Sequence, residues 1–378
     1  MAEGHLVHGL GTGLAAPAWP PVTPAEAAAV LARVPGAGVL EALEWHSPRP
    51  FSAAALARTS QGELFLKRHS PALRSPAGLA EEHAFIAHLR QAGLPVADVL
   101  ADAAGASAFA LGGWSWEVHR KSAGEDLYRE RPSWTGFLCP AHAHAAGAML
   151  GRLHRAAAGF AAPARAPAPL VAGNTLFAGG DPQAAAEAFV ARWPALGAYF
   201  AGTGWRAELA ALLAAADAAG LSRALGQRPT LWGHGDWHPS NLLWDGAGGV
   251  AGIMDFGLAD RTCALFDLAI ALERSVVAWL QLGKGEDAAL ADLPCADALL
   301  AGYASAAPLT GEDRALLARL LPLVHVEFAL SEMVYFEGIL ALRADTDLAW
   351  HTYLLGHARW FAGAGGQALL AATRGAAT

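Results

Sequence analysis

Cysteine is scarce in this sequence. Only three occur among 378 residues, at Cys139, Cys263 and Cys295, and no two are spaced as Cys-x-x-Cys. An odd and scattered set argues against a disulfide framework and against a cysteine-based zinc site. We therefore expect the three thiols to pack as small apolar side chains in a protein of the reducing cytoplasm.

Long apolar runs are also missing. Hydrophobic residues make up 54% of the chain, but no uninterrupted apolar stretch reaches the roughly 20 residues needed to cross a bilayer. Residues 1–8 lack the basic segment and apolar core of a secretory signal. We expect a cytoplasmic protein with neither a membrane span nor a membrane partner.

Positive charge is in deficit. The formal net charge is −8, which argues against a nucleic-acid partner. Between Asp260 and Trp350 there are 14 acidic and 6 basic side chains, so this part of the chain accounts for the deficit. The pattern favours either a binding site for a cationic small molecule or a solvated helical surface.

A glycine-rich nucleotide loop is absent. Alternating apolar and polar residues predict three antiparallel strands, over residues 38–45, 51–59 and 63–68. The turn at 46–50 contains no Gly-x-Gly-x-x-Gly, the motif with which protein kinases cover the phosphates. Ser52 or its backbone is a candidate phosphate contact instead.

The most informative stretch is residues 231–259. Asp236 and Asn241 lie five residues apart in a loop that contains Gly and Pro, so both can converge on one point. Two apolar runs around the turn at 245–249 predict a β-hairpin, which returns the chain to that point at Asp255. Two carboxylates and an amide oxygen are hard ligands that suit Mg²⁺ beside a nucleotide.

Lys67 lies near the end of the third predicted strand. Alternation places Phe65 and Lys67 on one face, and Leu64, Leu66 and Arg68 on the other. A lysine on the inner face can reach the phosphates of ATP as a point charge. Arg68 is the competing candidate.

The sheet continues after a helix. A helix over 79–92 is followed by strand patterns at 95–100, 107–111 and 114–120, which we interpret as two further antiparallel strands with an outer connection. They complete a five-stranded antiparallel sheet. The segment 119–124 then joins the sheet to the rest of the chain. The patterns that follow are helical, at 141–158, 181–192, 205–218, 268–282, 296–305, 311–338 and 347–361.

Two features of the helical part bear on function. Asp267 is predicted to cap the helix over 268–282, and Pro322 to break or kink the helix over 311–338. His325, Glu332 and Tyr335 fall near one face of that helix. They could line an acceptor pocket or form a buried polar cluster.

The motif as a whole resembles a known family. His-Gly-Asp at 234–236, Asn241 and Asp-Phe-Gly at 255–257 resemble the catalytic and metal loops of the aminoglycoside phosphotransferase and choline kinase group. The resemblance implies a bilobal, protein-kinase-like α+β fold with a five-stranded sheet and a mainly helical second lobe. The corresponding boundaries are a leader and helix at 1–37, a nucleotide-binding lobe at 38–119 and a catalytic, acceptor-binding lobe at 120–378.

The resemblance also implies roles for single residues. Asp236 would orient or deprotonate the acceptor hydroxyl, and Asn241 and Asp255 would hold Mg²⁺. Lys67 would bind the phosphates of ATP or GTP and pair with Glu82, for which Glu81 is the neighbouring rival. The backbone at Arg120 and Ser122 would hold the base. Asp267 would brace the catalytic loop.

Three functions fit these residues. The first is a kinase for a hydroxyl of an amino alcohol, amino acid, sugar or aminoglycoside. The second is a bacterial stress-type protein Ser/Thr kinase, whose helix resembles residues 81–85 here. The short connection between Asp255 and Phe266 leaves little room for a peptide-binding activation segment and disfavours it. The third is a non-catalytic nucleotide-binding module. A transition-metal cluster of His234, Asp236 and His238 would leave Asn241 and Lys67 unexplained.

Overall fold

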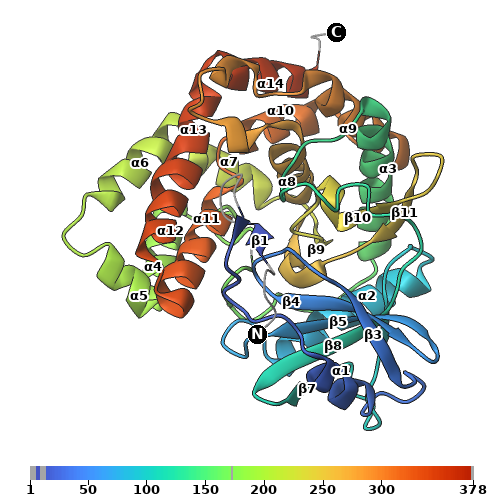
Figure 1. Cartoon of the computed structure of the whole chain (residues 1–378). Helices are drawn as coiled ribbons and strands as arrows, with labels where there is room; N and C mark the ends of the chain where they lie inside the picture. The colour runs from blue at the N-terminus through green and yellow to red at the C-terminus, as the bar shows by residue number, and fades with distance from the viewer. Residues whose placement is uncertain (1–5, 9–13, 172, 376–378) are drawn as a thin grey trace.

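The computed structural model describes residues 6–8, 14–171 and 173–375 (Figure 1). It confirms the predicted α+β architecture, with an antiparallel sheet near the N-terminus and a larger helical part above it. Much of the leader predicted at the start of the chain, residues 1–5 and 9–13, lies outside the described residues. No helix in the described ranges is long and apolar enough to span a membrane.

The sheet has five strand positions. The strand order is β3 (Leu40–His46), β4 (Ala53–Thr59), β5 (Gly62–His69) and β8 (Trp114–Arg120), all antiparallel. Two short strands, β6 (Asp98–Leu100) and β7 (Ala108–Leu111), share the fifth position because each pairs with a different half of β8. The sheet predicted from sequence is therefore present.

One face of the sheet packs on α1 (Pro24–Leu31), whose first turn is capped by Thr23 and Glu26. Leu64 and Leu66 are buried in that apolar cluster, while Lys67 lies on the opposite face. Arg68 is on the α1 side, where it pairs with Glu26. Arg68 is thereby removed as a rival of Lys67, because its guanidinium is held on the far side of the sheet.

The helix α2 (Pro76–Gln91) connects the sheet to the helical part. Its apolar residues Phe85, Ile86 and Leu89 belong to the large core of the helical part and not to the cluster around α1. Phe85 packs against Trp232 and Phe256, on either side of the catalytic stretch. This packing fixes α2, and with it Glu82, relative to the predicted metal loop.

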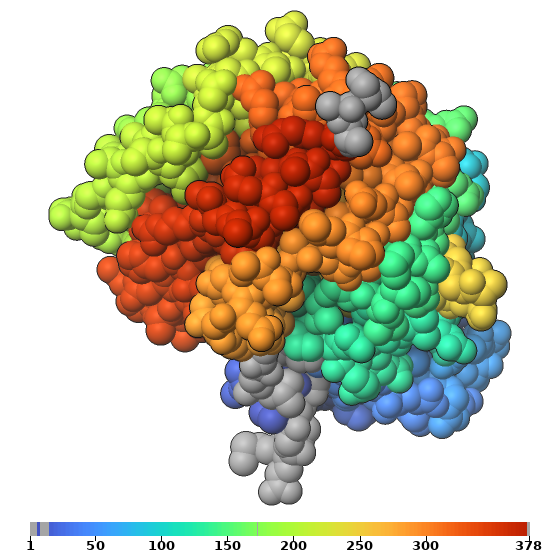
Figure 2. All heavy atoms as spheres, turned by 90° about the horizontal axis from the view of Figure 1, so that it is seen from above, coloured from blue at the N-terminus to red at the C-terminus, as the bar shows by residue number. Residues whose placement is uncertain are grey.

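The helical part is built from many short helices (Figures 1 and 2). They are α3 (Pro140–Ala157), α4 (Pro182–Arg192), α5 (Pro194–Tyr199), α6 (Trp205–Ala215), α7 (Ala218–Leu225), α8 (Ala264–Val276), α9 (Leu293–Ala306), α10 (Gly311–Leu320), α11 (Val326–Met333), α12 (Arg343–Leu348), α13 (Leu355–Ala362) and α14 (Ala364–Arg374). Figure 2 shows the C-terminal helices, in red, lying across the surface of this part.

Three predicted helices differ from the observed ones. The helix over 311–338 is interrupted at 321–325, as Pro322 predicted. The helix over 347–361 contains a wider π turn at Ala349–Leu354. The helix predicted at 268–282 begins at Ala264, so Asp267 lies in its first turn and is not its cap. An acidic side chain in a first turn carries the same sequence signal as a cap, which explains the error.

Further short strands form three antiparallel pairs outside the main sheet. They are β1 (Val7–His8) paired with β2 (Leu14–Ala15), β9 (Thr230–Gly233) paired with β12 (Asp260–Cys263), and β10 (Leu242–Trp244) paired with β11 (Val250–Ile253). The last pair is the predicted hairpin, with Leu242 opposite Ile253. The domain boundaries at residues 37 and 119 stay predictions.

Candidate active site

The loop that carries Asp236 is held from below by Asp267. The Asp267 carboxylate accepts hydrogen bonds from the backbone N–H groups of His234 and Gly235, both at 2.8 Å, and from the His154 ring at 2.9 Å. Burial alone would raise the pKa of Asp267, but these donors outweigh it and lower the pKa. A buried carboxylate that accepts three hydrogen bonds fixes the backbone just before Asp236.

Gly235 is required by this geometry. Its φ is +75°, and a Cβ at this position would lie 2.3 Å from the Leu258 carbonyl oxygen. The His234 ring donates from Nε2 to the Met254 carbonyl at 2.9 Å and accepts from the Asp236 N–H through Nδ1 at 3.2 Å. Burial lowers the pKa of His234. His234 thus occupies both ring nitrogens in bracing the loop and is not poised to act as a base.

Asn241 is oriented by Asp236. Its Nδ2 donates to the Asp236 backbone carbonyl at 2.9 Å and to Asp236 Oδ2 at 3.0 Å. The side-chain oxygen of Asn241 forms no hydrogen bond to the described residues and borders the site. The β10–β11 hairpin returns the chain beside it, because the Met254 N–H donates to the Asn241 carbonyl at 2.9 Å.

Asp255 follows the hairpin in a left-handed backbone conformation, with φ +56°. This is an uncommon state for a non-glycine residue and is concentrated at functional sites. Its Oδ1 accepts from Lys67 Nζ at 2.9 Å. Burial disfavours the charged lysine, but Asp255 and Glu117 outweigh it and raise the pKa of Lys67. The pair joins two residues that are 188 positions apart in the sequence.

Asp236 has a partner that the sequence did not reveal. Arg274, on α8, is buried and donates to Asp236 Oδ1 and, at 3.1 Å, to the Gly235 carbonyl. Its guanidinium also lies 4.4 Å from the Phe328 ring centre and 5.2 Å from that of Trp134. Burial would raise the pKa of Asp236, but Arg274 and then His238 hold it below its ordinary range. The carboxylate is therefore ionised and fixed in position.

The predicted ion pair between Lys67 and Glu82 is not formed. Glu82 is buried and accepts from Arg165 at 3.3 Å, while Lys67 contacts Asp255. Arg165 also donates to the Gly257 and Ala259 carbonyls. Because α2 packs on the predicted metal loop, the nearest cation to Glu82 is Arg165 and not Lys67. Glu82 acts on Lys67 only through its charge.

Two further arginines, Arg49 and Arg74, line the site. The sequence analysis did not predict them as site residues. Arg74 is buried and donates to four backbone carbonyls, including that of Gly257. Arg49, from the turn where a glycine-rich loop is lacking, donates to Ser133 Oγ at 2.7 Å. Arg49 lies in a surface turn and Arg74 in a Pro-containing loop. The sequence gave no sign of their contacts, because the partner residues come from distant segments.

The predicted residues border two adjoining pockets. Arg49, Ser52, Lys67, Asn241, Asp255 and Gly257 line both. One pocket lies under the sheet and extends to the joining segment at Arg120, Ser122 and Gly124. The other contains Asp236 and aromatic side chains, with Glu332 at its wall.

Of the three residues predicted on one helical face, only Glu332 lines this second pocket. His325 donates to the Leu354 carbonyl at 2.9 Å, and the Tyr335 hydroxyl accepts from Trp19 at 3.0 Å. The two predictions for this face each hold in part: one residue faces the pocket and two are structural. His325 lies just before α11 begins, and Tyr335 lies in the π-helical segment Val334–Leu340 that follows α11, so the three residues do not share one regular helical face.

Solved structures share this fold. An aminopropanol kinase associated with a microcompartment is 15% identical, with a TM-score of 0.57 over 91% of this chain and 99% of its own. An amicoumacin kinase in complex with AMP-PNP and Ca²⁺ is 16% identical, with a TM-score of 0.53 over 82% and 84%. An aminoglycoside phosphotransferase from Alicyclobacillus acidocaldarius is 17% identical, with a TM-score of 0.53 over 94% and 96%.

Sequence comparison decides the family. Residues 49–309, more than half of the chain, match the phosphotransferase enzyme family. The chain belongs to this family. Membership confirms the resemblance read from residues 234–257 and makes the protein a kinase that phosphorylates a hydroxyl group. No curated protein matches the sequence.

Within this phosphotransferase, the alternative of a metal cluster at His234, Asp236 and His238 finds no support. His234 is committed to Met254, and His238 accepts from or donates to Ser240 at 2.9 Å. Among the described residues, the one group of three potential ligands with mutually close ligand atoms is His83, Glu117 and His119.

Proposed function

We propose that the protein transfers the γ-phosphate of ATP to a hydroxyl of a small molecule that also carries a positive charge. The observation that supports this most directly is that two adjoining pockets meet at Lys67, Asn241 and Asp255. One pocket extends to the joining segment and would hold the nucleotide, and the other contains Asp236, aromatic walls and the buried acid Glu332. Catalysis here rests on positioning and charge, as phosphoryl transfer requires.

Asp236 acts on the acceptor. The oxygen of the acceptor hydroxyl attacks the γ-phosphorus, the bond from that phosphorus to the β,γ-bridging oxygen breaks, and ADP leaves. The hydroxyl proton passes to the Asp236 carboxylate. Because Arg274 and His238 lower the pKa of Asp236, its main contribution is to orient the hydroxyl, and it takes the proton late. Arg274 keeps the carboxylate in place.

The donor set fits Mg²⁺. Asn241 turns its amide nitrogen to Asp236, which leaves its oxygen for a cation. Asp255 has one oxygen on Lys67 and the other remaining. Amide and carboxylate oxygens are the ligands Mg²⁺ takes beside nucleotide phosphates, and the ion would neutralise their charge. When a nucleotide is bound, Lys67 moves its charge from Asp255 to the phosphates, and Arg120 and Ser122 hold the base by their backbone.

A small acceptor is favoured over a protein. The chain passes from the metal loop through β12 directly into α8, at Ala264, which leaves no long segment to support a peptide. The acceptor pocket is instead walled by Phe51, Trp134 and Phe328. Such a site suits a compact molecule that buries its carbon skeleton against aromatic rings.

Glu332 supports a cationic acceptor. It is only 3% exposed, yet it forms no hydrogen bond or ion pair to the described residues and borders the pocket that contains Asp236. Burial raises its pKa to about 8, and the charge of Arg274 offsets this only in part because Asp236 and Glu273 oppose it. Asp236 and Asp255 each form an ion pair, whereas Glu332 forms none with the residues that the structure describes. An ammonium group on the acceptor would complete this pairing.

The pH dependence of acceptor binding tests this role. With a pKa of about 8, Glu332 is largely protonated at pH 6 and gains its charge as the pH rises. The KM for an amino alcohol acceptor should therefore fall by up to about tenfold per pH unit from pH 6 toward 8, while the amine keeps its proton. Glu332→Gln should flatten this profile and leave the KM for ATP unchanged. A variant that retains the slope would remove Glu332 from acceptor binding.

A screen of acceptors tests the function as a whole. Amino alcohols, hydroxy amino acids, sugars and aminoglycosides are compared with generic protein substrates for phosphate transfer from labelled ATP. Each amine is paired with its deaminated or acetylated analogue. We expect transfer to an amine-bearing small molecule and at least tenfold less to its uncharged analogue. Transfer to proteins alone, or with no preference for the amine, would contradict the proposal.

A further inference from the structure

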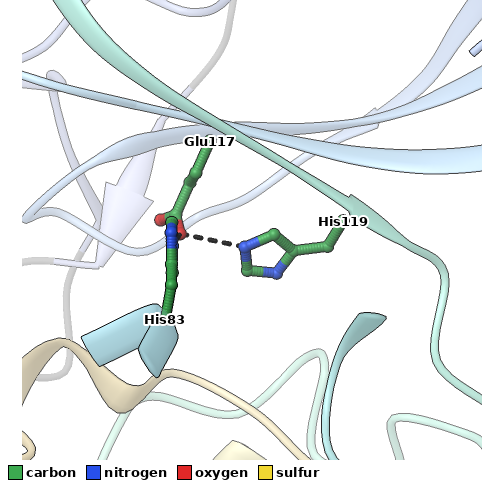
Figure 3. Close-up of side chains that lie close together, drawn as sticks. All are labelled: His83, Glu117 and His119. Atoms are coloured by element: carbon green, nitrogen blue, oxygen red, sulfur yellow. Dashed lines mark hydrogen bonds and ion pairs between the residues drawn. The ribbon is translucent and has the colours of Figure 1, made fainter. Parts of the chain in front are cut away.

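A buried carboxylate inside the nucleotide pocket is surrounded by three histidines. Figure 3 shows two of them, His83 and His119, beside Glu117. Glu117 Oε2 accepts from His83 Nε2 at 2.7 Å and from His119 Nε2 at 2.9 Å. Its other oxygen accepts from His69 Nε2 at 2.9 Å. Glu117 is 2% exposed, so this part of the pocket holds a buried polar cluster.

The cluster determines which nitrogen of His119 carries the proton. Burial would raise the pKa of Glu117, but His119 and the other two rings hold it well below its ordinary range. An ionised carboxylate only accepts hydrogen bonds, so the Nε2 of His119 must donate. A neutral imidazole that carries its proton on Nε2 has its lone pair on Nδ1. That nitrogen has no hydrogen-bond partner among the described residues, and His119 borders the pocket.

His119 is the first residue of the joining segment and lies near the end of β8. On β8 its side chain is on the same face as Glu117, opposite Phe65 and Lys67 on β5. Backbone groups at Arg120 and Ser122, the contacts proposed above for the base, would pair with positions 6 and 1 of a purine. The side chain of His119, which borders the pocket just before Arg120, is then next to position 6 of the purine. Adenine has an amino group there, which donates, and guanine has a carbonyl oxygen, which accepts.

We propose that His119, with its tautomer fixed by Glu117, selects adenine over guanine as the base of the phosphate donor. The acceptor lone pair on Nδ1 complements the adenine amino group and repels the guanine oxygen. The selection rests on the proposed nucleotide pocket, and it adds a side-chain contact at position 6 to the backbone contacts proposed there. Lys67 and Glu82 are the remaining charged groups around the cluster.

A metal ion is not needed to explain the cluster. The carboxylate–imidazole distances of 2.7 and 2.9 Å are those of hydrogen bonds, and His83 uses its second nitrogen on Ser107 at 3.0 Å. The Nδ1 atoms of His69 and His119 have no hydrogen-bond partner among the described residues, and of these two rings only His119 lines the pocket that reaches Arg120 and Ser122. The unsatisfied Nδ1 of His119 faces the nucleotide.

The test compares Mg·ATP, Mg·GTP and the triphosphate of purine riboside, which lacks a group at position 6. Dissociation constants come from calorimetry, and kcat/KM from an acceptor found in the screen. Wild-type protein should prefer ATP over GTP by at least about tenfold. His119→Leu should reduce that ratio by about tenfold and abolish the preference for ATP over the purine analogue.

Two further variants make the outcome specific. In Glu117→Gln the amide can donate to His119 Nε2, which moves the ring proton to Nδ1, so the preference should shift toward GTP with His119 intact. His88→Leu is the matched control, because His88 bonds the Ala156 carbonyl away from the pocket and should leave the ratio unchanged. Equal affinity of the wild type for ATP and GTP, or an unchanged ratio in His119→Leu, overturns the selection. Failure of any nucleotide to bind overturns the proposed function, and the selection with it.

Discussion

Replacing Asp236 with asparagine is expected to lower kcat by about 10²–10⁴ while nucleotide affinity stays near that of the wild type. The carboxylate faces the acceptor pocket and is held by Arg274 and His238, whereas the proposed phosphate and metal contacts come from other residues. Single-turnover phosphate transfer and calorimetric titration with Mg·ATP separate the two effects. Turnover at the wild-type rate in a pure preparation would contradict the assigned role.

The same substitution also affects stability. A second variant distinguishes the loss of stability from the loss of catalysis. Asp236→Asn leaves the buried Arg274 without its counter-charge, a loss of roughly 3–5 kcal/mol when one partner of a buried pair is removed. The double variant Asp236→Asn, Arg274→Met removes both charges and should recover much of that free energy of unfolding without recovering activity. If the double variant regains turnover, the defect of the single variant was instability and not loss of the catalytic carboxylate.

Replacing Asp255 with asparagine should weaken Mg·ATP binding by about 10–100-fold. Asparagine tolerates the left-handed backbone at this position, so the loop keeps its shape while the anionic ligand is lost. Removal of Mg²⁺ by a chelator should bring the affinity of the wild type for ATP close to that of the variant. Calorimetry at fixed free Mg²⁺ measures both.

Asp245→Asn is the matched control for this prediction. Asp245 is an exposed acid in the turn of the same hairpin, where its side chain accepts from the N–H groups of Ala247 and Gly249, both at 2.8 Å. An asparagine oxygen can accept the same bonds, so Mg·ATP affinity should not change. Equal affinities of wild type and Asp255→Asn for Mg·ATP would exclude Asp255 as a metal ligand.

Local patterns predicted the parts of the site that are close in the chain. Asn241 and Asp255 are joined by a hairpin whose two apolar runs and glycine-containing turn are visible in the sequence. Strand alternation likewise placed Lys67 on the inner face of the sheet. These predictions rest on backbone geometry with a short period, which a single sequence carries.

Contacts between distant segments could not be read in this way. The sequence assigned Lys67 to Glu82, but the structure pairs Lys67 with Asp255 and Glu82 with Arg165. Arg165 lies in an Ala- and Pro-rich loop that carried no signal of its own. Which of several cations reaches a buried carboxylate depends on how helices and loops pack, because long side chains bridge whichever segments the core brings within reach.

The sequence by itself determined the family and the α+β fold class, and it singled out the residues of the proposed phosphate and metal sites, because these depend on a motif and on periodicity. Only the tertiary structure decided the partners of those residues: Arg274 behind Asp236, Glu332 without a counter-charge, and Glu117 among three histidines. Each of these is an electrostatic environment. Such environments arise from burial and from the meeting of segments far apart in the chain, and no local pattern records them.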